Sequence, residues 1–494
     1  MAKGRTAEQP NILILMTDQQ RYDSLGCYGV DWVKTPNLDR LASEGLVFDN
    51  YYATNPICTP SRASLFTGKH LPGHGVYKLH DILPEDEICF TRRLQQRGYH
   101  TALFGKMHVS GRIYEEARRH PNDGFDVYEW CLEAGLSMDS PLNGYAPWLK
   151  DQDLKFHDRL KAEGRKLLHH PRELHLTHWA AERTIDYIRN VPKDRPFFCK
   201  MSVFDPHSPY EDYPLEMLEF VDEKRIPPPV GRSKGEKRPR GIMMERNHSY
   251  LGGFDNFDQE DFRKIRLGYF ASLALFDLEV GRVLEALEDR GLSENTLVIM
   301  TSDHGDMLGD QELLVKGAFF YDPCVKIPLI MRWPGRIPSG KRTGQLAQIH
   351  DLAATSLAAA GFSREELQQW MPEAMDLTSV AAGGSGHEYA VCCYRNSGIS
   401  DRGVAWDPPI HCTMFRDERF KLNVYHGEQL GELYDMQEDP QELNNLWDLP
   451  DYETVRLDLT DKLLEWMFRQ ELANDARGGE AIPDPKKRLV NALK

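Results

Sequence analysis

Four short apolar runs constrain this fold most, because each ends in polar residues that can carry chemistry. Unbroken, β-rich apolar runs of this length predict buried strands of a mostly parallel sheet. The runs and the clusters that follow them are 12–16 with Asp18 and Gln19, 101–104 with Lys106 and His108, 197–204 with His207, and 296–300 with Asp303 and His304. Ligands bind beyond the carboxyl ends of parallel strands, so we expect the four clusters to meet at one edge of the sheet.

Helical patterns separate the predicted strands. Apolar residues recur near a 3.6-residue period over 36–45 and, for longer, over 261–290. Gly45 and Gly291 supply the glycine that commonly ends a helix. The alternation of strands and helices predicts an α/β fold in which helices sandwich a large, mostly parallel sheet.

Composition divides the chain into two expected units. A stretch rich in Ala and Gly at 381–386 precedes strand-like segments and an amphipathic pattern. We therefore predict a catalytic α/β domain over 1–380 and a smaller C-terminal α+β unit over 387–494, closed by a helix near 452–470. Within the first domain, the Pro-rich and basic segment 223–253 predicts a mobile excursion, which is either a lid or subunit contact or simply a solvated loop.

Charge and cysteine content bound the class of protein. The formal net charge of −16 argues against a nucleic-acid partner, because nucleic-acid binders usually carry a basic face. No apolar segment is long enough to span a bilayer, so we expect a cytoplasmic protein without a membrane partner. The nine cysteines are scattered and show no metal-site spacing, so most should be free thiols. The sequence leaves open whether copies assemble into a homo-oligomer.

The first and last clusters predict a metal site. Its candidate ligands, three side chains with oxygen donors and one imidazole, are Asp18, Gln19, Asp303 and His304. Hard oxygen donors suit Ca²⁺, Mg²⁺ or Mn²⁺ better than Zn²⁺, and the imidazole favours Mn²⁺ without deciding the choice. A single Asp at a strand end is more often a turn or cap residue, but two matched pairs favour ligation.

Basic residues from five separate segments should reach the same edge. They are Arg62, Lys106, His108, His207 and Lys316. Arg and Lys can clamp a tetrahedral oxyanion, and His can move protons near neutral pH. The helix expected after Cys58, with Pro60 in its first turn, would add backbone N–H donors. Each residue alone is more often a solvated charge or a satisfied loop residue; together they predict a site for a small anionic ester.

Two stretches resemble the signatures of the type I sulfatases, a family of the alkaline phosphatase superfamily. The stretch 58–62 reads CTPSR and is similar to the C-x-P-x-R motif, in which the cysteine is oxidised after translation to formylglycine. The stretch 98–108 is similar to the second signature, G-Y-x-T-x-x-x-G-K-x-H. Further similarity at 35–39, 301–305 and 432–446 extends the resemblance over nearly the whole chain.

The resemblance implies an alkaline phosphatase-like fold and the hydrolysis of alkyl, aryl or sugar sulfate monoesters to alcohol and inorganic sulfate. Cys58 would become formylglycine, whose hydrated aldehyde attacks sulfur, and a formylglycine-generating enzyme would be the maturation partner. One divalent cation, Ca²⁺ or Mn²⁺, would be held by the two metal pairs and would also touch residue 58.

The resemblance also implies a role for each basic residue. Arg62 and Lys106 would orient and polarise the nucleophile. His108 would remove the proton that lets the covalent sulfo-enzyme collapse and expel sulfate. His207 and Lys316 would bind the sulfate and protonate the departing alcohol. Selectivity for that alcohol is expected to come from the regions 114–150 and 209–255, with the C-terminal unit as a further candidate.

The metal pairs depart from the commonest family pattern. Many sulfatases have Asp-Asp and Asp-Asn where this chain has Asp18-Gln19 and Asp303-His304. This variant resembles the branch that contains choline sulfatase and the phosphonate monoester hydrolases. Hydrolysis of phosphonate monoesters or phosphodiesters by the same nucleophile is therefore the alternative function. A lesser alternative is an unmodified, non-catalytic binding protein.

Overall fold

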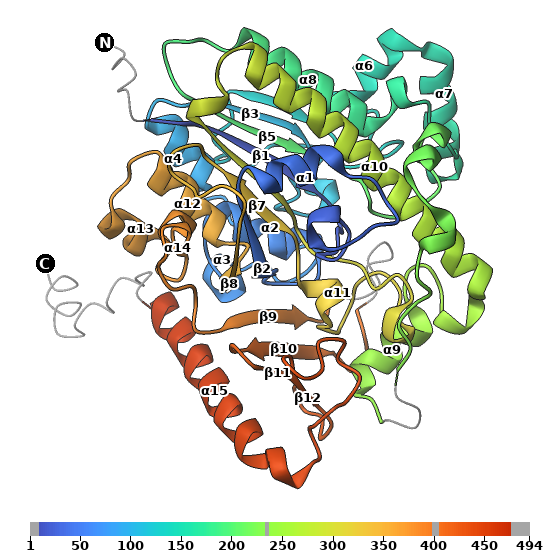
Figure 1. Cartoon of the computed structure of the whole chain (residues 1–494), viewed down its shortest axis with the longest axis vertical. Coiled ribbons are helices and arrows are strands. Elements are labelled where there is room, and N and C mark those ends of the chain that lie inside the picture. Colours follow the sequence, from blue (N-terminus) through green and yellow to red (C-terminus); the bar gives the residue numbers. More distant parts are fainter. Residues whose placement is uncertain (1–8, 233–236, 398–404, 476–494) are drawn as a thin grey trace, which may run out of the picture.

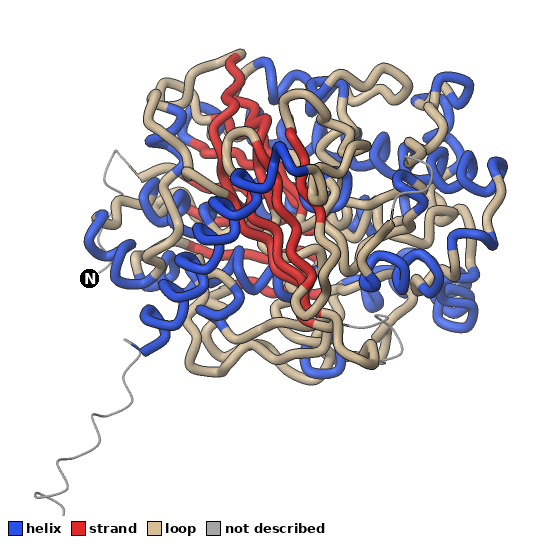
Figure 2. The backbone as a smooth tube through the Cα atoms, turned by 90° about the horizontal axis from the view of Figure 1, so that it is seen from below, coloured by secondary structure: helices blue, strands red, loops and turns tan. Residues whose placement is uncertain are grey.

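A computed structural model describes residues 9–232, 237–397 and 405–475, and an eight-stranded sheet runs through its main body (Figures 1 and 2). The strand order is β4-β3-β5-β1-β6-β7-β2-β8, and only β7 runs antiparallel to its neighbours. The strands are β1 Asn11–Thr17, β2 Leu46–Tyr52, β3 His100–Gly105, β4 Val127–Trp130, β5 Phe197–Ser202, β6 Thr296–Ser302, β7 Leu329–Arg332 and β8 Lys341–Gln348. The predicted mostly parallel sheet is confirmed.

The four apolar runs of the sequence form the adjacent strands β3, β5, β1 and β6. Every residue of β1 is buried, and its side chains alternate between two layers. Ile12 and Ile14 pack on one face of the sheet, whereas Leu13 and Leu15 pack on the other. A strand covered on both faces needs apolar residues at every position, which is why these strands are readable as unbroken runs.

Helices cover both faces of the sheet (Figure 2). The helices α1, α8 and α10 pack on one face, and α2, α4 and α12 pack on the other. The helices of the main body are α1 Pro36–Ser43, α2 Cys58–Thr67, α3 Leu71–His74, α4 Phe90–Gln96, α5 Arg112–Glu115, α6 Tyr145–Gln152, α7 Leu154–Glu163, α8 Leu176–Asn190, α9 Arg240–His248, α10 Gln259–Asp289, α11 Asp322–Val325, α12 Asp351–Ala359, α13 Arg364–Trp370 and α14 Leu377–Ala381.

Capping explains where the long helix lies. A capping box formed by Asp258 and Asp261 opens α10, and Gly291, with a φ of 66°, follows its end. The helix therefore matches the predicted range 261–290 to within two residues at its start. The shorter α1 likewise occupies most of the predicted range 36–45.

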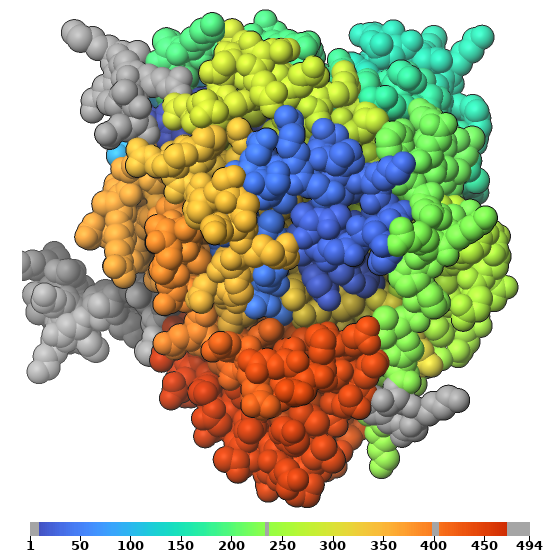
Figure 3. All heavy atoms as spheres, in the orientation of Figure 1, coloured from blue at the N-terminus to red at the C-terminus, as the bar shows by residue number. Residues whose placement is uncertain are grey.

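The C-terminal part forms a second, antiparallel sheet in the order β12-β11-β10-β9. Figure 3 shows it as the orange and red lobe at the base of the molecule. The helix α15 packs on this sheet through Leu459, Leu463 and Trp466. Its elements are β9 Ala390–Arg395, β10 His411–Arg416, β11 Phe420–Tyr425, β12 Glu432–Asp435 and α15 Glu453–Asp475. The predicted C-terminal strands and helix are confirmed, and β12 is an additional strand; the domain boundaries stay a prediction.

The segment 223–253 contains the helix α9. Ile242 of this helix is buried against the core that includes the C-terminal sheet. The positions 233–236 of the segment lie outside the described residues, and its mobility stays a prediction. All nine cysteines, which fall within the described ranges, are free thiols as expected. Among the described helices, none is long and apolar enough to cross a membrane.

Candidate active site

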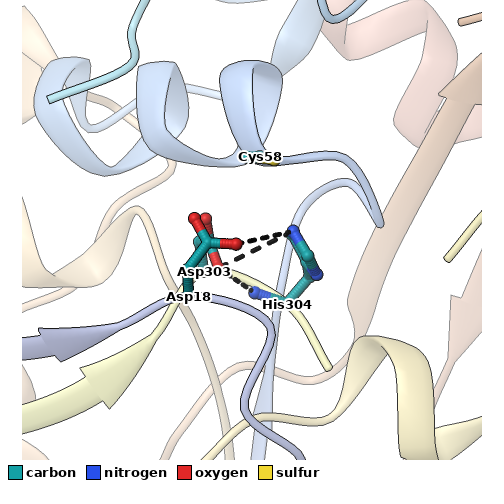
Figure 4. A group of neighbouring side chains, drawn as sticks. All are labelled: Asp18, Cys58, Asp303 and His304. Atoms are coloured by element: carbon teal, nitrogen blue, oxygen red, sulfur yellow. Dashed lines mark hydrogen bonds and ion pairs between the residues drawn. The ribbon is translucent and has the colours of Figure 1, made fainter. Parts of the chain in front are cut away.

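The carboxyl ends of β1, β3, β5 and β6 lie side by side at one edge of the sheet, because these strands are parallel neighbours. The polar clusters that follow them therefore meet there. Figure 4 shows Asp18, Asp303 and His304 facing one another beneath the first turn of α2, which carries Cys58. Residues from the two ends of the catalytic region are thus joined by the pairing of β1 with β6.

This group of side chains fits a divalent cation. Donor atoms of Asp18, Cys58, Asp303 and His304 all lie within 4.8 Å of one another. Asp18 Oδ1 is buried, finds no hydrogen-bond partner in the described part of the chain, and lies 3.9 Å from His304 Nε2. An unpartnered buried carboxylate oxygen is costly, and a bound cation would satisfy it. Two carboxylates with one imidazole suit Ca²⁺, Mg²⁺ or Mn²⁺.

Gln19, the other predicted ligand, is oriented by two neighbours. Its φ of 66° is uncommon for a residue other than glycine. The side-chain amide donates to Asp306 Oδ2 at 2.6 Å, and its oxygen accepts from Lys316 Nζ at 2.8 Å. The same Nζ lies 3.2 Å from His304 Nε2. The Gln19 oxygen and the His304 ring nitrogen therefore point toward a common space.

Arg62 is completely buried and ties the two carboxylates together. Its Nε donates to Asp303 Oδ2 at 2.6 Å, and its Nη2 donates to Asp18 Oδ2 at 2.9 Å. Lys106 Nζ lies 2.6 Å from the same Asp18 oxygen. Burial opposes ionisation of Asp18, but the charge of Lys106, supported by Arg62, holds the pKa of this carboxyl well below its usual value. Arg62 therefore acts on the carboxylates behind the pocket and is a positioning residue.

Cys58 occupies the first position of α2, where backbone N–H groups and the helix dipole favour an anion. Lys316 Nζ lies 3.3 Å from its Sγ, and His108 and His207 also contact the thiol. Burial raises the pKa of Cys58, but the charges of Lys106 and Lys316 outweigh it and hold the pKa well below its usual value. The residues around position 58 therefore form an anion-binding site.

The two histidines have defined orientations. His207 Nδ1 donates to the Ser208 carbonyl at 2.7 Å, which leaves Nε2 to accept from Lys316 at 2.9 Å. His108 Nε2 lies 3.2 Å from Thr59 Oγ1. Burial lowers the pKa of both imidazoles most, and the positive charge of a nearby lysine lowers it further. Both rings are therefore neutral at neutral pH, and a neutral imidazole can accept a proton.

Two buried carboxylates that the sequence analysis missed hold this arrangement in place. Asp306 orients the Gln19 amide, and Glu115 accepts the backbone N–H groups of 108–110. Within that turn His108 has a φ of 58°, so Glu115 supports a strained conformation that directs the ring into the site. Asp306 follows the same strand as Asp303, a signal that could have identified it. Glu115 stands in no motif.

Glu245 of α9, also missed, supports the loop that carries Lys316. Its Oε1 accepts from the backbone N–H of Ala318 at 3.0 Å and from Trp406 Nε1 at 3.3 Å. Burial raises the pKa of Glu245 to about 7. The segment expected as an excursion and Trp406, which precedes the second strand of the C-terminal sheet, are therefore both connected to the loop that carries Lys316 through this one carboxyl group.

The predicted basic residues, with the exception of Arg62, meet at the floor of one pocket. We define the inner pocket as Cys58, Lys106, His108, His207 and Lys316. We define the outer pocket as the other residues that line this pocket: Leu79, His80, Arg112, Leu132, Glu133, Leu136, Arg165, Phe204 and Tyr250. Of the regions from which selectivity was expected, 114–150 and 209–255 supply four of these nine residues.

Comparisons with known proteins agree with this geometry. The Sulfatase family model matches residues 10–362, which is more than half of the chain, and a model of the C-terminal part of N-sulphoglucosamine sulphohydrolase matches 405–469. An arylsulfatase of Clostridium perfringens is 28% identical, covering 92% of this chain and 94% of its own. An N-acetylglucosamine-6-O-sulfatase of Bacteroides thetaiotaomicron is 26% identical, covering 96% of this chain and 89% of its own.

A solved structure shares the fold over nearly its whole length. The phosphonate monoester hydrolase of Agrobacterium radiobacter matches with a TM-score of 0.73 at 24% identity, covering 94% of this chain and 96% of its own. The expected alkaline phosphatase-like architecture is confirmed by this likeness. The Sulfatase model covers more than half of the chain, so the chain belongs to the sulfatase family and is a sulfuric ester hydrolase.

Proposed function

We propose that this enzyme cleaves sulfate monoesters with a formylglycine formed from Cys58. One observation carries the proposal: the Cys58 side chain lies at the start of α2, 3.3 Å from the Lys316 ammonium group and in one buried group with Asp18, Asp303 and His304. A structural cysteine in a reducing compartment needs neither the cations nor the carboxylates. In this proposal, Sγ stands in for an oxygen of the modified side chain, and a formylglycine-generating enzyme makes the modification.

The two groups that the chain would acquire supply distinct chemistry. A hydrated formylglycine supplies two hydroxyls, one to bond to sulfur and one whose deprotonation lets sulfate leave, which the single hydroxyl of a serine could not do. A divalent cation, which we propose to be Ca²⁺ or Mn²⁺, supplies positive charge beside the sulfate oxygens. The ligands of this cation would be Asp18, Gln19, Asp303 and His304.

Lys106 and Lys316 bind and orient the negative oxygens of the ester in this proposal. Both ammonium groups are nearly completely buried, so their attraction for an anion is weakly screened. Arg62 contributes indirectly, because it holds Asp18 and Asp303 through charged hydrogen bonds of 2.9 and 2.6 Å. The floor of the pocket is therefore preorganised for a tetrahedral oxyanion.

Proton transfer is assigned to the two histidines. His108 contacts the side chain at position 58 and is neutral, so it can accept a proton from a hydroxyl there. His207 Nε2 accepts a hydrogen bond from Lys316 at 2.9 Å. A proton held by this Lys316–His207 pair can pass to the oxygen of the departing alcohol. The two imidazoles therefore serve the two opposite proton movements that ester cleavage and sulfate release require.

Two measurements test the proposal. Peptide mass spectrometry across position 58, on protein made with a formylglycine-generating enzyme, should show loss of the cysteine thiol and gain of an aldehyde or its hydrate. On that protein, kcat/KM should favour 4-nitrophenyl sulfate over 4-nitrophenyl phenylphosphonate. A preference for the phosphonate by orders of magnitude would instead establish the alternative hydrolase, and an intact thiol in an active enzyme would end the formylglycine account.

A further inference from the structure

Two of the three leucines of the outer pocket, Leu79 and Leu132, are held by the rest of the fold. The Leu79 carbonyl accepts a hydrogen bond of 2.9 Å from Thr59 in the first turn of α2. Leu132, which is 6% exposed, belongs to the main core on one face of the sheet. Leu136 follows in the same loop after β4 and is half-buried. The alcohol part of an ester bound in the inner pocket would therefore lie against apolar side chains at Leu79, Leu132 and Leu136.

An ion pair closes the far side of the outer pocket. Arg165 donates through Nε and Nη2 to the two oxygens of Glu133, the second at 2.6 Å. Glu133 is only 4% exposed, and it joins the loop after β4 to the turn at 164–166. Of the described residues that line the pocket, Glu133 alone carries a carboxylate, and Arg165 already occupies both of its oxygens. The pocket is therefore poorly suited to selecting a cationic alcohol.

We propose that the substrate is a small sulfate monoester whose alcohol part is compact and apolar, an aryl or short alkyl sulfate rather than a sulfated sugar. This inference rests on the proposed sulfate hydrolysis and narrows it. Hydroxyl groups of a sugar ring that face Leu79, Leu132 and Leu136 would lose water without gaining hydrogen-bond partners from these three side chains. An apolar ring of the same size would instead bury its surface against these side chains.

A matched pair of substrates tests this inference with the same class of leaving group. Cyclohexylmethyl sulfate and glucose 6-sulfate each carry the ester on a primary alcohol beside a six-membered ring, so their chemical reactivity is similar. We expect kcat/KM to be at least about tenfold higher for the cyclohexyl substrate, because only the sugar exposes hydroxyls to the leucines. An equal or higher value for glucose 6-sulfate would overturn the inference.

A matched pair of variants tests whether the leucine wall is the cause. Leu136→Asn should lower kcat/KM for cyclohexylmethyl sulfate about tenfold and reduce its advantage over the sugar. The inhibition constant of inorganic sulfate should stay within about threefold of wild type, because the inner pocket is untouched. Leu136→Met, which keeps the wall apolar, should preserve the preference. Equal losses on both substrates in the Asn variant would contradict the inferred role.

The outcomes also separate this inference from the proposed function. Turnover of 4-nitrophenyl sulfate together with a preference for glucose 6-sulfate would overturn the substrate class alone. Absence of turnover on every sulfate ester, in protein whose position 58 is formylglycine, would overturn the proposed function and the substrate class with it.

Discussion

In the inner pocket the Lys316 ammonium group contacts four polar groups, whereas three leucines and Phe204 line the outer pocket beside a few polar side chains, two of which form the Glu133–Arg165 ion pair. The inner residues are connected by hydrogen bonds to charged groups, and these bonds restrict the orientation of the side chains. The leucines of the outer pocket offer no directional bonds. The inner pocket can therefore select a geometry and a charge, while the leucine side of the outer pocket can select only size and polarity.

This difference indicates how a sulfatase can keep its chemistry while its substrates vary. A change in the inner pocket disturbs several partners at once, because its groups share hydrogen bonds. A change at Leu132 or Leu136, in the loop that follows β4, alters only one side of the outer pocket. We therefore expect inner variants to lose activity on all esters and outer variants to change the ranking of esters.

The largest expected effect is that of Cys58→Ala. Removing the nucleophile should lower kcat by about 10⁴-fold or more on every substrate. The melting temperature should stay close to that of wild type, because a methyl group fits the space of the thiol. Cys27→Ala, a half-buried cysteine outside the pocket, is the matched control and should keep activity. Residual activity near wild type in the Cys58 variant would remove the basis for calling this the reactive centre.

Metal removal should have the next largest effect. Treatment with a chelator should abolish most of the turnover on all esters, and Ca²⁺ or Mn²⁺ should restore it. Removal should also lower the melting temperature, because Asp18 Oδ1 would again lack a partner. Full activity and an unchanged melting temperature after exhaustive chelation would exclude a functional metal at Asp18, Asp303 and His304.

Arg62→Lys tests the positioning of the carboxylates. Lysine keeps the positive charge but offers no planar fork to join Asp18 with Asp303. We expect kcat to fall about 10- to 100-fold, with a weaker affinity for the metal. The loss should be similar for cyclohexylmethyl sulfate and glucose 6-sulfate. A loss confined to one ester would mean that Arg62 contributes to selectivity for the alcohol part of the substrate. The inner and outer pockets would then not have separate roles.

Glu245→Gln should have a smaller, pH-dependent effect. Folding raises the pKa of this buried carboxyl to about 7. Its contribution to stability is therefore present below the unfolded pKa and is lost as pH rises through about 7, by an amount on the order of 3 kcal/mol. Glutamine does not ionise, so the variant should gain melting temperature relative to wild type between about pH 5 and pH 8.

The same variant tests whether Glu245 positions Lys316. Because glutamine can still accept from the Ala318 N–H, kcat should fall less than about tenfold, and Glu245→Ala should cost more. A melting-temperature difference that is constant with pH would show that Glu245 does not titrate as inferred.

Glu133→Gln should have the smallest effect and should act on the outer pocket alone. The amide can keep a hydrogen bond to Arg165 but loses the charge of the pair. We expect kcat/KM to change by less than about threefold on 4-nitrophenyl sulfate, with a larger change on bulkier esters. A general loss on all esters would place this ion pair with the catalytic groups instead.

Four of the eight strands of the main sheet could be predicted, because their signal is local. Strands β1, β3, β5 and β6 are buried on both faces, so each is an apolar run. The strands β2 and β8 carry polar residues such as Asn50 and Gln348 within their length and were not predicted. The candidate site was predictable to the extent that it follows those apolar strands or the CTPSR motif.

The sequence by itself determined the central strands, the proposal that Cys58 is the reactive side chain and the charged groups that accompany it, because each is encoded within a few consecutive residues. Only the tertiary structure decided that Arg62 lies behind the pocket, that Glu115 and Glu245 support its loops, and that leucines form its outer wall. Those facts depend on which distant segments pack together, and no short stretch of sequence carries that information.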